Sequence, residues 1–411
     1  MPLTLTEADG LLKEFYVDVA GGPAEQLHNS SPFLAQLEAT ADNTNAESDE
    51  AVWAIHTGRN WGVASIADGG ILPTAGRQQD LKARQGLKTH VIRIALTKQV
   101  MRAARSTRGA FEKAISREMK LGVKDLRRQI ARQVQGTADG VIATCGTTTA
   151  STTIVLAAAT TLVQMRQFEV GMRVDVGTLA SPASIASSRE IISIDRAART
   201  ITVTGATFTT SSANFVFLAG SGGGPGAGQL EMTGLQHTVS ATTTLYGINP
   251  ATVPVHAAVV DAPATARPAT LQSFEKGLGD VYLESGYEGK RLALTTPGLM
   301  IAFSANLQSQ RRYPGEKSDL KGGYSGLEVY TTHGSAIFTD DKDVPSGNAY
   351  LLALDEWLIN EWQPAGWEDE DGSILHLVSG TLSYEAVYSW MIDIATTQRN
   401  ANWRGTNFIE P

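Results

Sequence analysis

The longest regular pattern of apolar and polar positions in the chain lies between Thr107 and Gln135. Its apolar residues recur at intervals of four, with one interval of three: Phe111, Ile115, Met119, Val123, Leu126, Ile130 and Val134. This spacing puts all seven on one face of an α-helix. Such a helix is roughly 40 Å long, far more than the usual three turns. The pattern therefore predicts a long amphipathic helix and an extended body, with a core helix of an α+β enzyme as the alternative.

Local residues mark where this helix begins and ends. Ser106 and Thr107 suit the N-cap, and Gly136 suits the position after the last turn. Gly109 and Gly122 each cost about 1 kcal/mol inside a helix, so tertiary packing must hold it. The faces away from the apolar residues carry many cations, and the basic face includes Arg117, Lys124, Arg128 and Arg132.

An alternating pattern predicts two strands and a long tip over residues 51–98. The first strand contains Val52–Ile55, and the second contains the alternating run from Thr89 to Leu96. About thirty glycine-rich residues between them are too many for an ordinary hairpin loop. A two-stranded ribbon is marginal alone, so we expect this one to lie on a neighbouring molecule. The candidate contact residues are Trp61, Arg77, Lys82, Arg84 and Lys88.

The segment before these strands, residues 1–50, predicts an arm. Leu11–Val19 suits a short element, and Ser31-Pro32 suits the start of a short helix. The polar, acidic stretch that follows buries little by itself.

Residues 146–228 have a different composition, rich in Thr, Ser, Ala and Gly, with short alternating runs. Strands are expected near 172–176, 191–194, 200–204 and 214–218, with a hairpin turn at Asp195–Arg199. The Gly-rich run 220–228 reads as a linker. This pattern predicts a small β-barrel or sandwich inserted into a host domain.

The remainder of the chain predicts mixed α/β structure. Helices are expected over Ala269–Ser285 and from Pro297 to about Arg311. The first should point Leu271, Phe274, Leu278 and Tyr282 inward. Strands are expected near 292–294, 327–330, 335–338, 350–354 and 374–397, with a turn at Asp343–Gly347.

Charge is unevenly distributed along the 411 residues, whose net charge is -8. Lys98–Arg132 holds eleven Lys or Arg against three acids, a balance of +8, whereas Asp355–Asp371 holds seven acids and no Lys or Arg. These stretches allow charge pairing within or between copies, and two solvated faces are the alternative. The single cysteine, Cys145, excludes an intrachain disulfide. No signal peptide and no apolar run of about 20 residues is present, so neither secretion nor a membrane is expected.

Familiar catalytic, cofactor and metal patterns are missing. The chain has no HExxH, GxSxG, dinucleotide-binding or CxxC pattern, and its Gly-rich run contains no P-loop lysine. Asp340-Asp341-Lys342-Asp343 lacks the glycine and closing glutamate of a calcium loop, which favours a solvated turn. We therefore expect no catalytic residue, no cofactor and no metal.

The order of these elements resembles the major capsid proteins of tailed double-stranded-DNA bacteriophages, which have the Hong Kong 97-like capsid fold. Similar fragments are the passage Trp53–Arg132, the stretches Gly334–Ile337 and Asp343–Tyr350, and the ending Gln398–Asn402. Each fragment is degenerate, and the resemblance rests on their order across most of the chain outside the insert.

The resemblance implies an α+β chain divided into the parts of that fold. These are an N-terminal arm (1–50), an E-loop (51–98), a P-domain with its spine helix (99–145), the inserted β domain (146–228), a return to the P-domain (229–254), an A-domain (255–355) and closing P-domain strands (356–411).

The resemblance also implies a structural protein that is not an enzyme. Copies would assemble as pentamers and hexamers into an icosahedral shell around the genome, in the virion and first in the bacterial cytoplasm. A separate scaffolding protein, a portal, non-specific contact with packaged DNA and a decoration protein are the implied partners. An encapsulin-type compartment, a cytosolic enzyme with a β accessory domain and a cell-surface adhesin are the alternatives.

Some family members join subunits by an isopeptide bond between Lys and Asn. Lys82 or Lys88 with Asn400 or Asn402 are the pairs to consider here, and ordinary surface positions explain them equally well.

Overall fold

The computed structural model describes residues 31–40, 42–45, 50–68, 70–86, 88–99, 108–224, 229–307, 318–319, 325–369 and 373–410. Within this part the chain forms two compact units. The first contains Lys88–Arg132 and Glu361–Ile392, and the second contains Ser31–Leu87, Gln133–Asn360 and Asp393–Pro411. The element expected over Leu11–Val19 lies outside the described residues, as do the side chains of 108–117, among them Phe111, Ile115 and Arg117.

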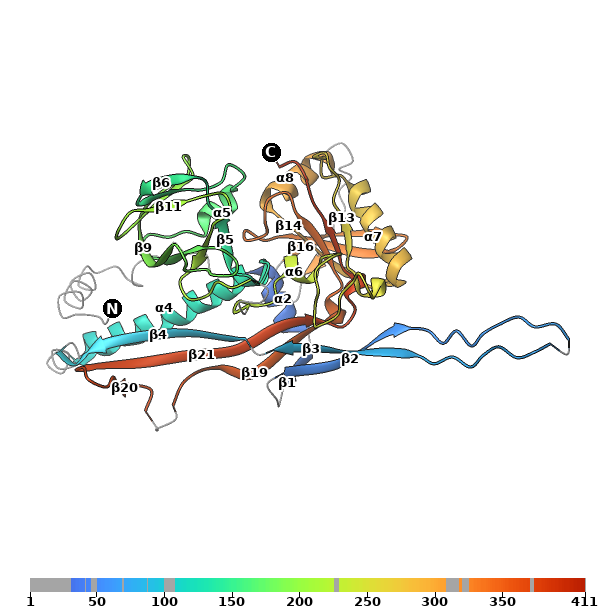
Figure 1. Ribbon diagram of the computed structural model, residues 1–411, viewed down its shortest axis with the longest axis horizontal. Coiled ribbons are helices and arrows are strands. Elements are labelled where there is room, and N and C mark those ends of the chain that lie inside the picture. The colour runs from blue at the N-terminus through green and yellow to red at the C-terminus, as the bar shows by residue number, and fades with distance from the viewer. Residues whose placement is uncertain are drawn as a thin grey trace. The chain divides into compact units, whose positions relative to one another are not determined.

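A long helix and a narrow sheet make up the first unit (Figure 1). α4 spans Arg108–Val134, one residue inside the expected bounds at each end. β4 (Thr89–Thr97) pairs antiparallel with β21 (Ser383–Thr396), and β21 also pairs with β19 (Trp357–Trp367) and β20 (His376–Leu377). A Cβ at Gly122 would lie 3.3 and 3.4 Å from the Cδ1 atoms of Ile94 and Ile92. The glycine that weakens the helix thus lets β4 approach it.

One strand of the expected hairpin pairs elsewhere. The alternation of Thr89–Leu96 is real, but its partner is β21 rather than the strand near Val52. β2 (Glu50–Gly58) pairs instead with β3 (Gln79–Gly86), with Trp53 opposite Ala83. β3 is almost wholly polar, so its pattern gives no signal of a strand. β19 lies within the closing strands expected over 356–411 and contains Glu361 of the acidic stretch.

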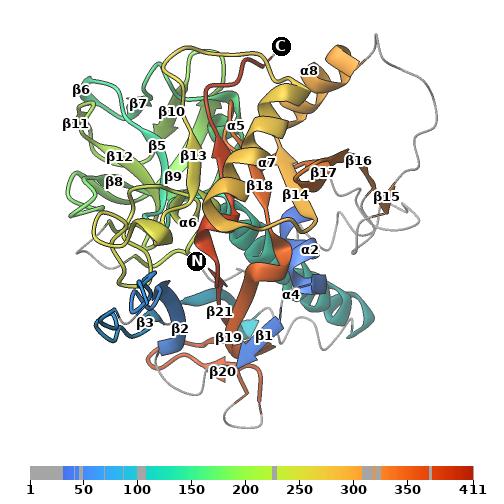
Figure 2. The ribbon, with the colours of Figure 1, turned by 90° about the vertical axis from the view of Figure 1, so that its right-hand side faces the viewer.

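The second unit is built on a seven-stranded mixed sheet (Figure 2). Its order is β13-β22-β18-β14-β17-β16-β15, with parallel pairing between β13 and β22 and between β14 and β17. Its strands are β13 (Val259–Asp261), β14 (Arg291–Thr295), β15 (Ser318–Asp319), β16 (Ser325–Thr331), β17 (Gly334–Asp340), β18 (Ala349–Leu352) and β22 (Trp403–Gly405).

Two helices bury an aromatic core against this sheet. α7 (Leu271–Ser285) and α8 (Pro297–Leu307) contribute Phe274 and Phe303, which pack with Phe338 and Trp403. The Thr270 side chain caps the start of α7, and Gly286 ends it with φ 67°. Tyr282, expected to point inward, is 36% exposed, and Val281 is buried in its place.

Short elements complete this unit. α2 (Pro32–Thr40) agrees with the helix expected after Ser31, and Phe33 packs edge-on against Trp357 with ring centroids 5.7 Å apart. The others are β1 (Asp42–Asn45), α6 (Leu235–Thr238), η2 (Pro254–His256), η4 (Leu354–Glu356) and η5 (Arg399–Ala401).

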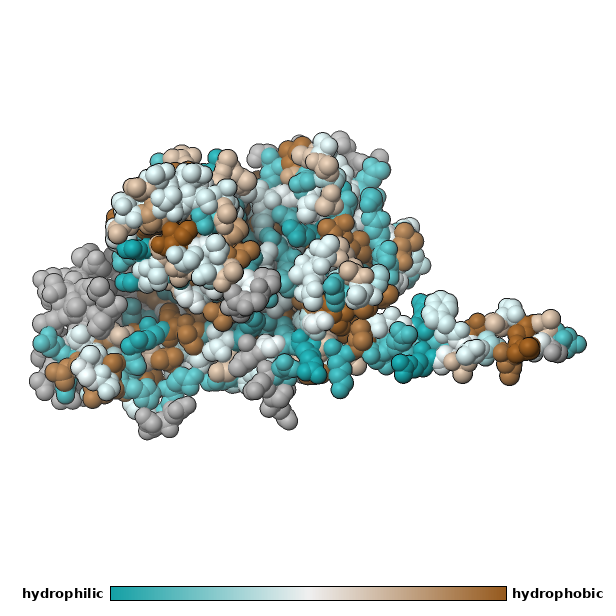
Figure 3. All heavy atoms as spheres, viewed as in Figure 1, coloured by the Kyte–Doolittle hydropathy of each residue, from teal (hydrophilic) through white to brown (hydrophobic). Residues whose placement is uncertain are grey.

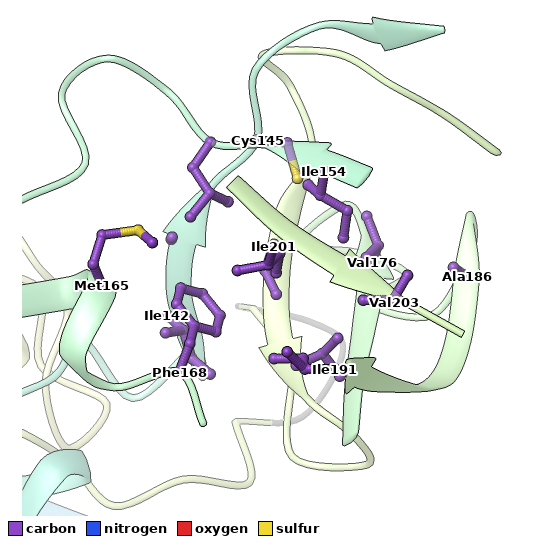
Figure 4. Packing of buried hydrophobic residues seen from close by; sticks show 14 residues of the cluster. Ile142, Cys145, Ile154, Met165, Phe168, Val176, Ala186, Ile191, Ile201 and Val203 are labelled. Carbon is purple, nitrogen blue, oxygen red and sulfur yellow. The ribbon is translucent and has the colours of Figure 1, made fainter. Parts of the chain in front are cut away.

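The inserted β module has its own core. Its elements are β5 (Val141–Thr144), β6 (Thr148–Ser151), β7 (Thr153–Val155), α5 (Leu162–Arg166), β8 (Arg173–Gly177), β9 (Ala186–Asp195), β10 (Thr200–Val203), β11 (Phe208–Thr210) and β12 (Phe215–Leu218). Six strands form one sheet, and β11 pairs with β6. Ile142, Phe168, Val176 and Ile201 pack together in its interior (Figure 4).

The module begins earlier than the expected boundary at residue 146. β5 pairs with β12, which brings Val141–Thr144 into the module. Gly223 N donates to Asp139 O at 3.1 Å, so the two ends of the module meet there. Gly140 lies at φ 75°, and a Cβ on it would be 2.9 Å from Ser221 O. A glycine is required because the two chain ends cross so closely.

Candidate assembly surfaces

The β2–β3 hairpin is fixed to the second unit at its base. Trp53 packs edge-on against Tyr246 with ring centroids 4.7 Å apart, and Arg84 N donates to Tyr246 O at 3.1 Å. Ala83 is fully buried beside Tyr246 and Ala395. Burial of these groups holds the first residues of the hairpin in one position.

A buried amide strengthens this attachment. Gln85 is 4% exposed, and its Nε2 donates to Asp393 Oδ2 and to Ile394 O, both at 2.8 Å. Asn360 donates in turn to Gln85 Oε1. Asp393 also accepts from Thr233, through its backbone N and its hydroxyl, each at 2.8 Å. Asp393 lies in β21 and is completely buried.

Beyond the ends of β2 and β3, two glycines let the two sides of the hairpin lie close together. The β ladder ends at Gly58 and Gln79. Further out, a Cβ at Gly62 would lie 2.7 Å from Gly76 N, and one at Gly76 would lie 2.8 Å from Gly62 N. Asn60 Oδ1 accepts from Gly62 N at 2.8 Å. A side chain at either position would push the two sides of the hairpin apart. This close approach of Gly62 and Gly76, hereafter the glycine crossing, therefore requires glycine.

The hairpin tip presents a cluster of exposed apolar side chains, hereafter the apolar tip. The exposed fractions are 82% for Trp61, 82% for Val63, 49% for Ile66, 93% for Ile71 and 77% for Leu72. Figure 3 shows hydrophobic surface near the end of the projecting arm. Exposed apolar clusters of this kind mark surfaces that another molecule covers.

The expected cationic contact residues do not form one cluster. Arg77, Lys82 and Arg84 are all exposed along the hairpin, and Arg84 lies 3.5 Å from Glu50. Lys88 belongs to the other unit, beyond the end of β3. Trp61 stays a predicted contact residue. The four other exposed apolar residues of the tip were not among the candidates, because single apolar residues between glycines form no regular pattern.

The side chains of α4 fall into two groups over its described part. Leu126, Ile130 and Val134 are buried, and Met119 is half-buried. Lys124 is exposed and Arg128 is half-buried. Arg132, expected on the basic face, is only 8% exposed, and its Nε donates to Gln129 Oε1 at 3.1 Å. The basic face therefore does not continue to Arg132.

The chain ending holds buried polar groups that could not be recognised from the sequence. Arg399 is 1% exposed and donates to four backbone oxygens: Thr238 O at 2.7 Å, Thr243 O at 2.9 Å, His256 O at 3.3 Å and His237 O at 3.3 Å. Burial lowers the pKa of Arg399 to about 10, at which the guanidinium is still charged near neutral pH.

Asn402 is fully buried as well. Its Oδ1 accepts from Ala353 N at 3.1 Å and from Trp357 Nε1 at 3.0 Å, and its Nδ2 donates to Gln398 O at 3.1 Å. An isopeptide bond at Asn402 would require these contacts to break. Asn400 is half-buried, and its Nδ2 donates to Glu284 O at 3.4 Å.

A second exposed surface lies on α7. A hollow of about 850 Å³ lies between this helix and the turn that joins β16 to β17. Leu283 and Tyr330 in its lining are 80% and 77% exposed, and Tyr282 stacks on His333 at 5.0 Å. Lys276 pairs with Asp280 at 2.6 Å along one side.

The described residues contain no group of three or more potential metal ligands. None of the helices in that part is both long and apolar enough to cross a membrane.

No protein-family model matches the chain, and no curated protein matches it either. Among solved structures, the subunit in the capsid asymmetric unit of cyanophage A-1(L) is similar at a TM-score of 0.56 and 12% identity, over 95% of this chain and 97% of that one.

Two further structures are more distant. The SrpI encapsulin complex from Synechococcus elongatus has a TM-score of 0.46 at 10% identity, covering 99% and 96% of the two chains. The capsid of a native GTA particle has a TM-score of 0.47 at 8% identity, covering 99% and 100%. Scores below 0.5 carry no weight in the choice between a capsid and an encapsulin. The similarity to the cyanophage subunit confirms the fold predicted from the sequence: the chain has the α+β Hong Kong 97-like capsid fold, with a β module inserted after its long helix.

Proposed function

We propose that this chain is the major capsid protein of a tailed double-stranded-DNA bacteriophage. The main support is the shared fold with a cyanophage capsid subunit, at a TM-score of 0.56 over nearly the whole of both chains. In this role the protein is structural and has no catalytic activity. Copies form pentamers and hexamers that close into an icosahedral shell around the genome, first in the host cytoplasm and then in the virion.

The hairpin supports assembly because its two ends differ. At its base, Trp53 packs against Tyr246 and the buried Gln85 donates to Asp393. At the other end, the apolar tip is exposed. Docking of the tip on a second copy would remove this apolar surface from water, at about 25 cal/mol per Å². Obligate assemblies typically bury thousands of Å² per copy, which an arm of this kind helps to supply.

The remaining partners follow from the same proposal. A separate scaffolding protein directs closure of the shell, and a portal occupies one vertex of the shell. A decoration protein binds the outer surface of the shell. Cations on α4 such as Lys124 and Arg128 supply contact with DNA that is independent of sequence and weakened by salt.

Electron microscopy and light scattering of the purified chain, alone and with a candidate scaffolding protein, test this proposal. Closed shells or pentamers and hexamers are the expected result. Monomers or dimers under both conditions would contradict it. Shells that copurify with one enzyme rather than with nucleic acid would identify an encapsulin-type compartment instead.

The contribution of the tip has a separate test. The double variant Trp61→Ser, Ile71→Ser should keep the wild-type circular dichroism and melting temperature but lose most closed shells. Leu162→Ser, at a residue of the β module that is 59% exposed, is the matched control and should assemble normally. Equal shell yields for the two variants would show that the apolar tip is not an assembly contact.

A further inference from the structure

A carboxylate lies in the interior of the second unit, just after β17. Asp341 is 1% exposed, although the run Asp340–Asp343 predicts a solvated turn. A buried carboxylate without a paired cation is costly, so its neighbours should show how the fold tolerates it.

Three hydrogen bonds connect Asp341 to its own loop and to two distant segments of the chain. The Ser31 hydroxyl, at the start of α2, donates to Oδ2 at 2.6 Å. Gln135 Nε2, just after α4, donates to the same oxygen at 3.3 Å. Asp343 N donates to Oδ1 at 3.0 Å. The carboxylate therefore bonds to two segments separated from it by 310 and 206 positions.

α2 follows Ser31 directly and is well buried. Phe33 and Leu37 are fully buried, and Phe33 packs against Trp357. Ser31 lies directly before these residues, so the helix and the carboxylate are covered together. Displacement of α2 would take the Ser31 hydroxyl away from Asp341 and open that side of the carboxylate to water.

Burial favours the neutral form of Asp341, whereas the hydrogen bonds that it accepts favour the charged form. The charged groups that act on it are Lys342 and Asp343, both in its own loop. From α2 and from the residues after α4 it faces the uncharged Ser31 hydroxyl and Gln135 amide, and its own N donates to Thr295 O of β14 at 3.0 Å. Burial raises the pKa of Asp341 to about 6, against the lowering effect of the Ser31 and Asp343 hydrogen bonds.

The side-chain amide of Gln135 offers an acceptor for a hydrogen bond from the protonated carboxyl. Gln135 Oε1 is buried and has no hydrogen-bond partner within the described residues. Turning this amide by 180° would place its oxygen where Nε2 now lies, 3.3 Å from Asp341 Oδ2, to accept a hydrogen bond from the protonated carboxyl. Amide oxygen and nitrogen are assigned from such networks, so both orientations are chemically available.

We propose that Asp341 is a proton-binding fastening for α2, which holds the helix when protonated and loosens it when ionised. The docked state binds more protons than the undocked state because docking buries the carboxyl. Docking is therefore strongest in acid and weakens as the pH rises through about 6. This fastening operates within one chain and does not depend on shell formation.

Amide hydrogen exchange of the full-length chain tests the fastening. The observable is the protection factor of the α2 amides, which corrects for the intrinsic effect of pH on exchange, in samples of equal assembly state by light scattering. The wild-type protection of α2 should fall about tenfold from pH 5 to pH 7.5. Asp341→Asn should abolish this dependence, and Asp343→Asn, in the same loop, should retain it.

A milder variant covers the case in which Asp341→Asn does not fold. Ser31→Ala removes a donor that favours the charged carboxylate, so the midpoint of the α2 transition should move to higher pH. A wild-type protection factor that is constant between pH 5 and pH 7.5 would overturn the proposal. So would an unchanged or lower midpoint in Ser31→Ala.

Discussion

Single buried polar residues organise the second unit. Arg399, Asn402 and Asp393 are each enclosed, yet every one of them bonds to several backbone or side-chain groups. Buried polar atoms cost free energy unless they are satisfied, and these atoms satisfy loop carbonyls and amides in exchange. Around short elements such as α6 and η2, these side chains make the hydrogen bonds that regular secondary structure would otherwise provide.

Arg399 provides the sharpest test at this scale. Arg399→Lys keeps the charge but loses the planar fork that reaches four carbonyl oxygens, so the free energy of unfolding should fall by about 2–4 kcal/mol. Urea unfolding followed by tryptophan fluorescence measures the change. Arg196→Lys, at an exposed turn of the β module, is the control and should change stability by less than about 0.5 kcal/mol. Equal effects of the two variants would show that the four carbonyl contacts are unimportant.

Elements show how packing overrides local preference. Gly277 and Gly279 lie two residues apart in α7. A Cβ at Gly277 would be 2.8 Å from the Trp403 ring, whereas the nearest atom to a Cβ at Gly279 would be His333 Cδ2 at 3.7 Å. The same helix thus contains one glycine required by its neighbour and one that is not.

The two alanine variants should therefore change stability in opposite directions. Gly279→Ala should gain up to about 1 kcal/mol from helix propensity. Gly277→Ala should lose about 1–3 kcal/mol because the indole must move. Thermal melts of both proteins in one buffer measure the difference, and a gain in both would mean that the Trp403 contact is soft.

Sequence patterns predicted the elements with apolar periodicity and missed those without it. α4, α7, β4 and the module strands β8, β9, β10 and β12 were expected from their spacing, and the structure contains each of them, whereas β5, β6, β7 and β11 were not expected. β3 is mostly polar, so its pairing with β2 rather than its own pattern makes it a strand. Trp61 stays a predicted contact residue. The local pattern did not indicate the burial of Arg132 or of Asp341, and Asp341 is bonded to Ser31 and Gln135, far away in the sequence.

At the scale of the whole molecule, the β module is an inserted domain whose first and last residues lie close together. Its core contains residues from Ile142 to Val216, and Asp139 and Gly223 meet at its base. The host sheet and α7 contribute none of these core residues. This arrangement predicts that the module folds without the host.

Two fragments separate the structural boundary from the one that composition suggests. Residues 139–224 expressed alone should give a cooperative thermal transition, since β5 and β12 are both present. Residues 146–228 lack β5 and the buried Ile142, and should melt lower or without a cooperative transition. Identical melting curves would show that β5 belongs to the host rather than the module.

The glycine crossing at Gly62 and Gly76 has a kinetic consequence. It holds residues 59–68 and 70–78 of the hairpin close together, and about ten extended residues on each side span roughly 30 Å. An apolar tip at the end of a long hairpin increases the distance at which two diffusing copies first make contact. Encounter would then begin at the arm and proceed inward, so shortening the arm should slow the formation of the first dimers more than it weakens the finished contacts.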